Sequence, residues 1–352
     1  MKKKVAYYVT GATGHLGRTI VEQLLKLDFK VYAFSLPNDN GLNKLVKEYK
    51  GLLEVINGNI LSKDDVVKFI KNNKLYLKRV IHCASLISIS QKYDERIYNI
   101  NVNGVKNIAD VCLEDNVDNF IYVSSVHALE EKKKGIISET SSFDPEKVRG
   151  LYAKTKATSS NYVLSSVEKG LRGNIVMPSG FLGPNDYLLG RLTGVIRDYL
   201  SGSLTAIVRG GYDIVDVRDV SNAILTLSNS KTYGKTYILN GHYITIARLL
   251  EIVSIYTKKK PIKVVLPYWF VKMFIPLISL HFILHKSEPL FTLYSLTTLR
   301  TNSNFSHFAA EKELDYHPRN IDETIKDTID FIYKNKQIKE KIKKSKNKSA
   351  KV

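Results

Sequence analysis

Three glycines near the start of the chain constrain its fold more than any other feature. Gly11, Gly14 and Gly17 follow an apolar run at Val5–Thr10 and begin an amphipathic stretch at Leu16–Leu27. Glycines at this spacing allow a tight turn, a close approach of the backbone to a pyrophosphate, and close packing of a helix on a strand. The helix that follows would present unpaired N–H groups and the positive end of its dipole. We therefore expect a dinucleotide-binding strand–helix unit here.

The rest of the first half alternates short β-rich runs with longer helical stretches. Further strands are expected at Lys30–Phe34, Leu53–Asn57, Val80–Ala84, Phe120–Ser124 and Gly173–Met177, and helices at Asn101–Cys112 and Tyr152–Val167. This alternation predicts an α/β fold with a Rossmann-type, doubly wound parallel sheet.

After Pro178 the sequence changes in texture. Glycine and proline become denser up to Gly194, and one more strand is expected at Tyr233–Leu239. We expect three regions. Residues 1–177 are mainly the dinucleotide-binding domain. Residues 178–333 are mainly a smaller C-terminal substrate-binding cap whose chain crosses back to the sheet, and 334–352 form a Lys-rich disordered tail.

Composition excludes several classes of protein. The 352 residues are 44% apolar and 25% charged, as in an ordinary globular chain. Cys83 and Cys112 both lie in apolar runs and are too few for a disulfide framework or a four-cysteine zinc site. We therefore predict no metal and place both thiols in the core. The apolar run Val5–Val9 is too short for a signal peptide, so a cytoplasmic protein is expected.

The formal charge of +19 is unevenly distributed. Residues 334–352 hold nine lysines and one glutamate and supply +8 of it. No aromatic residue interleaves with these lysines, which favours a solvated tail over a specific nucleic-acid site.

Tyr152 and Lys156 stand four residues apart in a predicted helix and therefore share one face. A phenol with a pKa near 10 is a poor base at neutral pH, but an adjacent ammonium favours the phenolate and can also hold a nicotinamide ribose. Ser124 and Ser125 end a predicted strand and offer a hydroxyl to polarise a carbonyl oxygen. Together they predict proton transfer coupled to hydride transfer.

The choice of dinucleotide depends on the end of the second strand. An acid there would hold a ribose 2′-hydroxyl, and an arginine would hold a 2′-phosphate. The segment Phe34–Asp39 has neither at the expected place, and Ser35 suits either cofactor. The absent acid and the basic body favour NADP(H) over NAD(H).

Several segments, taken in order, resemble one enzyme family. The glycine turn is followed by residues 80–85 (VIHCAS), 101–104 (NVNG), 122–125 (YVSS) and the Tyr152/Lys156 pair. Residues 177–186, 213–220 and 308–332 match later family segments. The series resembles the extended short-chain dehydrogenase/reductases of the NAD-dependent epimerase/dehydratase superfamily, over about residues 4–335. The nearest branch is that of dihydroflavonol reductases and 3β-hydroxysteroid dehydrogenases.

The resemblance implies an enzyme that transfers a hydride between NAD(P) and a small hydrophobic ketone, aldehyde or secondary alcohol. Tyr152 would be the general acid/base, Lys156 its electrostatic and ribose partner, and Ser125 the carbonyl-polarising residue, with Ser124 the second choice. The cofactor would contact Gly11, Thr13, Gly14, His15, Leu16, Gly17, Ser35, Asn59, Ile60, Ala84, Ser85, Tyr152, Lys156 and Pro178. Asn59 stands where the family usually has Asp, and His82 is interpreted as a packed strand residue.

Departures from the family pattern separate its branches. Sugar-nucleotide epimerases usually have Asn where this chain has Gly180, and the dehydratases usually have Asp-Glu where it has Val126-His127. A nucleotide-sugar epimerase or dehydratase is therefore an alternative, and a non-catalytic NAD(P)-binding or membrane-surface protein is a second one. For the dihydroflavonol-reductase and 3β-hydroxysteroid-dehydrogenase branch we expect an apolar substrate pocket, lined by Phe181, Leu182, Tyr187, Leu188 and Leu189. A homodimer, common in the family, stays open.

The most apolar stretch, 264–284, corresponds to the substrate lid of the family. Its charged residue Lys272 and its two prolines argue against a membrane span, because a central lysine costs about 3 kcal/mol on insertion scales. Peripheral contact with a bilayer stays open but is not favoured, with the tail attracted to anionic lipid. The side chains that would enter such a bilayer are Tyr268, Trp269, Phe270 and Phe274.

Overall fold

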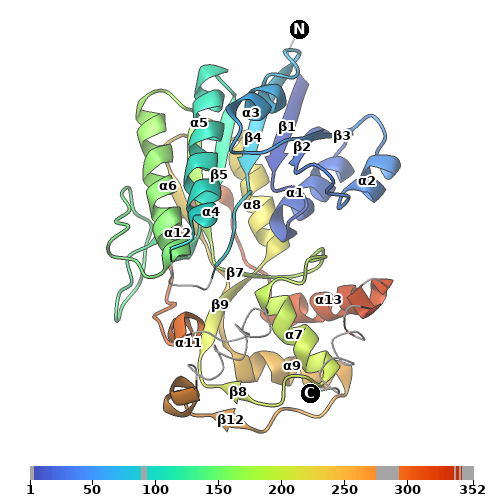
Figure 1. Ribbon diagram of the computed structural model, residues 1–352, viewed down its shortest axis with the longest axis vertical. Coiled ribbons are helices and arrows are strands. Elements are labelled where there is room, and N and C mark those ends of the chain that lie inside the picture. Colours follow the sequence, from blue (N-terminus) through green and yellow to red (C-terminus); the bar gives the residue numbers. More distant parts are fainter. Residues whose placement is uncertain (1–3, 89–92, 275–292, 337, 341, 343–352) are drawn as a thin grey trace.

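A seven-stranded parallel sheet forms the centre of the larger half of the molecule (Figure 1). The computed structural model describes residues 4–88, 93–274, 293–336, 338–340 and 342. The strands lie in the order β10-β6-β5-β4-β1-β2-β3, and every neighbouring pair is parallel. They are β1 (Lys4–Thr10), β2 (Lys30–Ser35), β3 (Leu53–Asn57), β4 (Tyr76–His82), β5 (Asn119–Val123), β6 (Gly173–Pro178) and β10 (Thr236–Leu239). The predicted doubly wound sheet is confirmed.

Helices cover both faces of this sheet. One face carries α1 (His15–Lys26), α8 (Val217–Asn229) and α12 (Phe308–Leu314). The other carries α3 (Lys63–Ile70), α5 (Gly104–Glu114) and α6 (Leu151–Glu168). The short helices α2 (Asn43–Glu48) and α4 (Glu95–Tyr98) lie in connections. The central strands β1, β5 and β6 are buried on both faces and are therefore mostly apolar rather than alternating, whereas the edge strand β3 is partly exposed.

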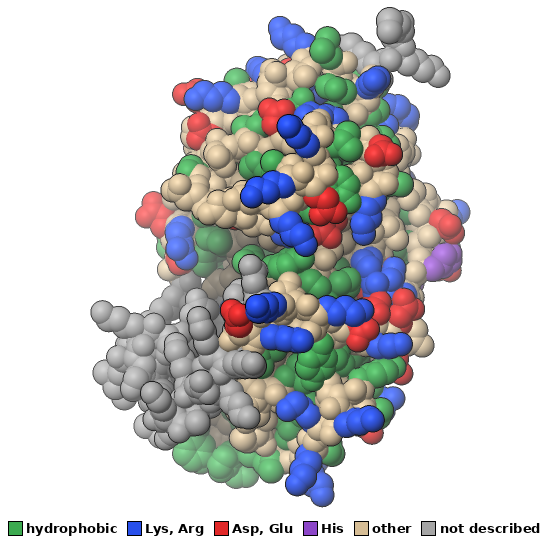
Figure 2. Space-filling model, turned by 90° about the vertical axis from the view of Figure 1, so that its right-hand side faces the viewer, with side chains coloured by type: hydrophobic (Ala, Val, Ile, Leu, Met, Phe, Trp, Pro, Cys, Tyr) green, Lys and Arg blue, Asp and Glu red, His purple; other side chains and the backbone are tan. Residues whose placement is uncertain are grey.

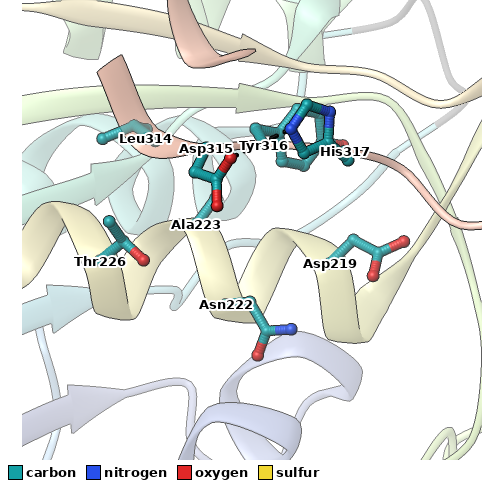
Figure 3. Close-up of a pocket in the computed structure, with 8 residues that line it drawn as sticks. All are labelled: Asp219, Asn222, Ala223, Thr226, Leu314, Asp315, Tyr316 and His317. Carbon is teal, nitrogen blue, oxygen red and sulfur yellow. Dashed lines mark hydrogen bonds and ion pairs between the residues drawn. The ribbon is translucent and has the colours of Figure 1, made fainter. Parts of the chain in front are cut away.

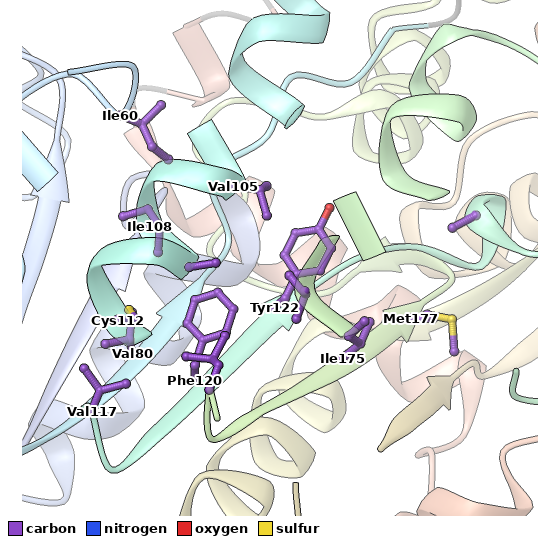
Figure 4. Close-up of a cluster of buried hydrophobic side chains, with 14 of the residues drawn as sticks. Ile60, Val80, Val105, Ile108, Cys112, Val117, Phe120, Tyr122, Ile175 and Met177 are labelled. Carbon is purple, nitrogen blue, oxygen red and sulfur yellow. The ribbon is translucent and has the colours of Figure 1, made fainter. Parts of the chain in front are cut away.

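The core beneath α5 shows why this half folds as it does (Figure 4). Phe120 and Tyr122 project from β5 toward Ile108 and Cys112 of α5, and all four side chains are fully buried. Ile108 and Cys112 are one helical turn apart, so the helix presents a single apolar stripe to the sheet. Cys112 is a core residue, as expected, whereas Cys83 is only partly buried.

The smaller half, the cap, lies beyond the carboxyl ends of the strands (Figure 1). Its elements are β7 (Gly180–Leu182), β9 (Gly211–Asp216) and β11 (His242–Thr245) in one sheet, and β8 (Ile207–Val208) with β12 (Val265–Leu266) in another. Its helices are α7 (Arg191–Ser201), α9 (Ile246–Thr257), α11 (Leu293–Thr298) and α13 (Ile321–Lys334). The chain returns to the large sheet after β9, because β10 pairs with β6.

Buried ion pairs join the cap to the large half where β9 leads into α8. The Asp216 carboxylate accepts from the backbone N–H and guanidinium of Arg218 at 2.7–2.9 Å. Arg319, just before α13, donates to Asp219 at 2.6–2.8 Å. Burial by itself raises the pKa of Asp216, but the bonds from Arg218 outweigh it and hold the pKa below its usual value. This network fixes the C-terminal helix against the start of α8.

The predicted elements differ from the observed ones mainly at their ends. The strand expected at Val80–Ala84 begins four residues earlier and ends at His82, because Ala84 turns its N–H to the Thr10 hydroxyl. The helix expected from Asn101 is preceded by a π-helical turn, η1 (Asn99–Asn103). Residues 275–284 of the apolar stretch and most of 334–352 lie outside the described residues. Within the described part of the chain, no helix combines the length and the apolar character that a membrane crossing requires.

Candidate active site

The glycine turn joins β1 to α1 and packs against the end of β4. Gly11 has a φ of +64°, and a Cβ on it would lie 2.7 Å from the backbone nitrogen of Ala84. A Cβ on Gly17 would collide with the carbonyl oxygen of Gly11. Gly14 donates its N–H to that same oxygen at 3.0 Å, and among the described residues no side chain caps the helix that begins at His15. Only glycine fits this cradle, which leaves the N–H groups of the first turn available to an anion.

The loop after β2 folds back onto this turn. Asp39 accepts a hydrogen bond from the Thr13 hydroxyl at 2.8 Å and another from the Gly41 N–H at 2.9 Å. The Ser35 hydroxyl at the end of β2 is buried and has no hydrogen-bond partner among the described residues. The sequence has no acid at the end of β2, but the loop brings Asp39, four residues after Ser35, back to the glycine turn.

The predicted adenine-side residues differ in exposure. The Asn59 side chain is exposed and accepts from the Leu61 N–H at 3.0 Å, which closes a local turn. Ile60 is buried against Gly104. A Cβ added at Gly104 would lie 3.0 Å from the Cγ2 atom of Ile60. The side-chain oxygen of Asn59 is therefore used within its own loop.

Tyr152 and Ser125 meet where α6 passes the end of β5. Ser125 precedes the 3-10 turn η2 (Val126–Ala128), and its hydroxyl accepts the His127 N–H at 3.2 Å. Burial raises the pKa of Tyr152 to about 12, and a hydrogen bond with Ser125 partly counteracts that rise. Ser124 points elsewhere, with its hydroxyl 2.8 Å from that of Ser160 in the core. The fold therefore brings Ser125, and not Ser124, to the phenol.

Lys156 is 2% exposed and lies one turn along α6 from Tyr152. Its ammonium donates to the Val123 carbonyl oxygen at 2.8 Å and lies 5.9 Å from the Tyr152 ring centre and 4.9 Å from that of Tyr122. Burial lowers its pKa to about 7. An ammonium has three N–H donors, and one of them is used by the Val123 carbonyl oxygen. The protonated form of Lys156 therefore places a positive charge near the Tyr152 ring, with two N–H groups left for a ligand.

His82 lies behind this group at the end of β4. Its Nδ1 atom is 2.7 Å from the Thr10 hydroxyl, and its ring stacks on Tyr122 at 5.8 Å. Burial, and then the nearby Lys156 charge, lower its pKa to about 3. A neutral imidazole packed between strands agrees with its interpretation as a packed strand residue.

Asn101 joins the segment after β4 to α6, although no role follows for it from the sequence. It is 1% exposed within η1 and accepts from the Ser85 hydroxyl and the Leu86 N–H at 3.0 and 2.8 Å. Its amide nitrogen donates to the Leu86 carbonyl and the Thr155 hydroxyl on α6. The signal in the sequence was a polar amide at a helix position that the apolar pattern assigns to the core.

The remaining predicted cofactor residues divide between the turn and the cap. Leu16 is buried in the core, so only its backbone faces the turn. His15 directs its Nε2 atom to the Pro184 carbonyl oxygen at 2.8 Å and lies edge-on to Phe181. Pro178 ends β6, paired with Leu239 of β10.

The expected apolar pocket is not assembled as predicted. Leu182 and Leu189 pack into the core of the cap, because β7 turns Leu182 inward, and Leu188 is 69% exposed. Tyr187 lies under the Arg18 guanidinium, 3.9 Å from its ring centre. Of the five predicted lining residues, Phe181 and Tyr187 approach the first turn of α1, through His15 and Arg18.

A separate pocket of about 310 Å³ lies between α8 and the segment after α12 (Figure 3). Its lining residues are Asp219, Asn222, Ala223, Thr226, Leu314, Asp315, Tyr316 and His317. None of them is a predicted site residue, so this pocket is distinct from the Tyr152 group.

The fold and site define a class of protein, the Rossmann-type oxidoreductases, whose ligands bind where the strand order reverses. Here that point lies between β1 and β4, beside the glycine turn. A family model for the NAD dependent epimerase/dehydratase family matches residues 7–240. The chain belongs to this family and is an NAD-dependent oxidoreductase acting on CH–OH and C=O groups.

Relatives from two organisms cover most of the chain. It is 27% identical to sterol demethylase protein B of Methylococcus capsulatus over 244 residues, 69% of this chain and 72% of that one. It is 24% identical to the decarboxylating sterol-4-alpha-carboxylate 3-dehydrogenase erg26 of Schizosaccharomyces pombe over 332 residues, 90% and 94% of the two chains.

Solved structures share the whole fold. The crystal structure of gox2253 superposes with a TM-score of 0.78 at 27% identity, covering 94% of this chain and 98% of that one. The dTDP-glucose 4,6-dehydratase of Bacillus anthracis, solved with NAD, gives 0.74 at 15% identity, with 95% and 98% covered. The latter likeness is one of fold alone.

Proposed function

We propose that the protein is a dehydrogenase/reductase that interconverts an apolar secondary alcohol and its ketone, with Tyr152 as general acid/base. The observation that carries this proposal is the joint placement of Tyr152, Ser125 and Lys156 at the carboxyl end of β5. The glycine cradle and the unpartnered Ser35 hydroxyl fit a dinucleotide, whose nicotinamide supplies or accepts the hydride when bound.

The chain's own groups handle the proton. In the reductive direction Ser125 donates a hydrogen bond to the carbonyl oxygen, and Tyr152 transfers its phenolic proton to the same oxygen as the carbonyl carbon gains the hydride. In the oxidative direction the Tyr152 phenolate, which the neighbouring Lys156 ammonium stabilises, takes the proton from the alcohol. A buried phenol with a pKa of about 12 is protonated at neutral pH and so begins the cycle as an acid.

The cofactor we infer is NAD(H), against the preference expected from the sequence. Asp39 is bonded to Thr13 in the glycine turn, which places a carboxylate near the end of β2. A carboxylate there accepts from a ribose hydroxyl and repels a 2′-phosphate. The family model, described as NAD dependent, agrees with this inference.

A nucleotide-sugar substrate is the second candidate, and the structure argues against it at Gly180. A Cβ at Gly180 would lie 2.9 Å from Leu192 and 3.2 Å from the Asp213 carbonyl oxygen. The asparagine that sugar-nucleotide epimerases usually carry there would have to displace the Leu192 side chain. We therefore infer an apolar substrate, and a 3-hydroxysterol is the first to examine, because two relatives are named for sterols.

The experiment is a turnover assay of the purified protein with NAD⁺ and two substrate panels. One panel holds 3-hydroxysterols and other apolar secondary alcohols, and the other holds UDP- and dTDP-sugars. We expect NADH formation with the first panel only, and a loss of about 10²–10⁴ in kcat for Tyr152→Phe with NADH binding retained. Turnover of nucleotide sugars, or full activity in Tyr152→Phe, would refute the proposal.

A further inference from the structure

The end of the cap farthest from the large sheet carries exposed apolar side chains among lysines. We name residues 255–274 the cap-end surface; they run from the last turn of α9 through β12 into the helical residues 268–274. Its exposed apolar side chains are Ile255, Tyr256, Val264, Val265, Trp269, Phe270, Met273 and Phe274. Figure 2 shows hydrophobic side chains at this lower end of the molecule, with lysine or arginine beside them.

The helical residues 268–274 are apolar on both faces. Val271 is 6% exposed and packs into the cap core, and the Tyr268 ring lies 4.8 Å from the Arg300 guanidinium. The face of this helical segment that carries Tyr268 and Val271 therefore packs against the rest of the cap. Trp269, 66% exposed, and Phe274 lie on either side of Phe270, at ring distances of 5.8 and 4.9 Å. Among the described residues nothing covers the Trp269 side chain, and an exposed aromatic group of this kind is typical of a contact surface.

The charge of this segment identifies the partner. Residues 252–274 contain five lysines and neither aspartate nor glutamate. The lysines are Lys258, Lys259, Lys260, Lys263 and Lys272, all exposed and without an acidic partner among the described residues. A second copy of the chain would bring these cations against their own equivalents, which is unfavourable. An anionic lipid surface accepts both the lysines and the aromatic rings, since tryptophan favours the membrane interface.

We propose that the cap-end surface docks the enzyme on an anionic membrane surface, with Trp269, Phe270 and Met273 inserted among the headgroups and the five lysines on the lipid phosphates. The carboxyl ends of the sheet strands, where Tyr152 lies, face the same cap. Docking therefore holds the catalytic half away from the bilayer with the cap between them. The inference rests on the surface alone and does not depend on the identity of the substrate.

Trp269 is the only tryptophan in the chain and reports directly on this contact. The full-length protein is titrated with two kinds of vesicle. One is phosphatidylcholine with about 30% phosphatidylserine, which gives a negatively charged surface, and the other is pure phosphatidylcholine. We expect a blue shift of the Trp269 emission, and quenching by lipids brominated near the headgroup, with the anionic vesicles only. Added salt should weaken the binding, because screening shortens the range of the attraction.

Charge variants separate this surface from the other lysines. The triple change Lys258→Glu, Lys259→Glu and Lys260→Glu should lower the vesicle partition coefficient by at least about 100-fold. The matched control makes the same charge change at Lys44, Lys47 and Lys50, which are exposed around α2 in the other half of the molecule. This control should bind nearly as the parent does.

Four results would overturn the proposal. Absent binding refutes it outright. Binding without any change in Trp269 emission, or equal binding by both triple variants, assigns the attraction to the lysines of 334–352. A blue shift that grows with protein concentration in the absence of vesicles assigns the surface to a second copy of the chain.

Discussion

The Lys156 ammonium lies 5.9 Å from the centre of the Tyr152 ring, one turn away on the same helix and almost fully buried. Its 2.8 Å hydrogen bond to the Val123 carbonyl oxygen ties α6 to the end of β5, the strand that delivers Ser125. A single side chain thus links the helix that carries the proposed acid to the strand that carries its hydroxyl partner.

Burial of Lys156 makes the stability of the unliganded protein depend on pH. Its pKa falls to about 7 in the folded state and returns to about 10.4 on unfolding. Between these values the unfolded chain binds more protons at this side chain, so the contribution of Lys156 to the free energy of unfolding rises as the pH increases above about 7. Chemical denaturation should show that the parent gains stability with pH relative to Lys156→Met, in which this contribution is absent.

The control for that experiment is Lys154→Met on the same helix. Its ammonium is solvent-facing and pairs with the exposed Glu146. The Lys154→Met protein should keep the parent's pH dependence. The same slope in Lys156→Met and the parent would contradict the assigned burial.

Replacing Ser125 and Ser124 separately tests which serine polarises the substrate. Ser125→Ala should lower kcat roughly 100-fold, because it removes a hydrogen bond to the developing charge. Ser124→Ala removes the bond to Ser160 and should cost about 1 kcal/mol of stability, with kcat little changed. Steady-state kinetics and denaturation of both proteins distinguish the roles. A larger kcat loss in Ser124→Ala would reverse the assignment.

Asp39 should control the preference between NADH and NADPH. We expect the parent to bind NADH more tightly, and Asp39→Asn to lose roughly fivefold of that preference because a negative charge facing the 2′ position is removed. Fluorescence titration with each nucleotide measures the ratio of the two Kd values. Glu48→Gln, an exposed acid at the end of α2, should leave the ratio unchanged. Tighter NADPH binding by the parent would refute the role of Asp39.

Gly17→Ala should abolish nucleotide binding and destabilise the fold. Its Cβ would overlap the Gly11 carbonyl oxygen, which is backbone and cannot move without opening the turn. Gly194→Ala on α7 is the matched change, since a Cβ there has no neighbour closer than 3.7 Å. Gly194→Ala should be neutral or stabilise the protein by up to about 1 kcal/mol. Thermal unfolding and NADH titration of both variants measure the difference, and nucleotide binding by Gly17→Ala would contradict the cradle.

The sequence by itself determined the sheet and most of the helices around it. The glycine spacing, the apolar strands and the Tyr152/Lys156 interval are local patterns, and hydrogen bonding within a helix or a turn fixes their geometry. The strand ends were less accurate, because the end of β4 depends on a bond between Ala84 and Thr10, which are far apart in the chain.

Only the tertiary structure decided which residues meet at the site and on the surface. Ser124 and Ser125 are neighbours of the same type, and the packing of α6 sends one into the core and the other to Tyr152. Asp39 reaches Thr13 through a loop whose path no periodicity encodes. Likewise, an apolar stretch can be core, lid or contact surface. Between residues 268 and 274, Val271 packs into the cap core and Trp269 stays exposed, because burial depends on what the rest of the chain places opposite a side chain.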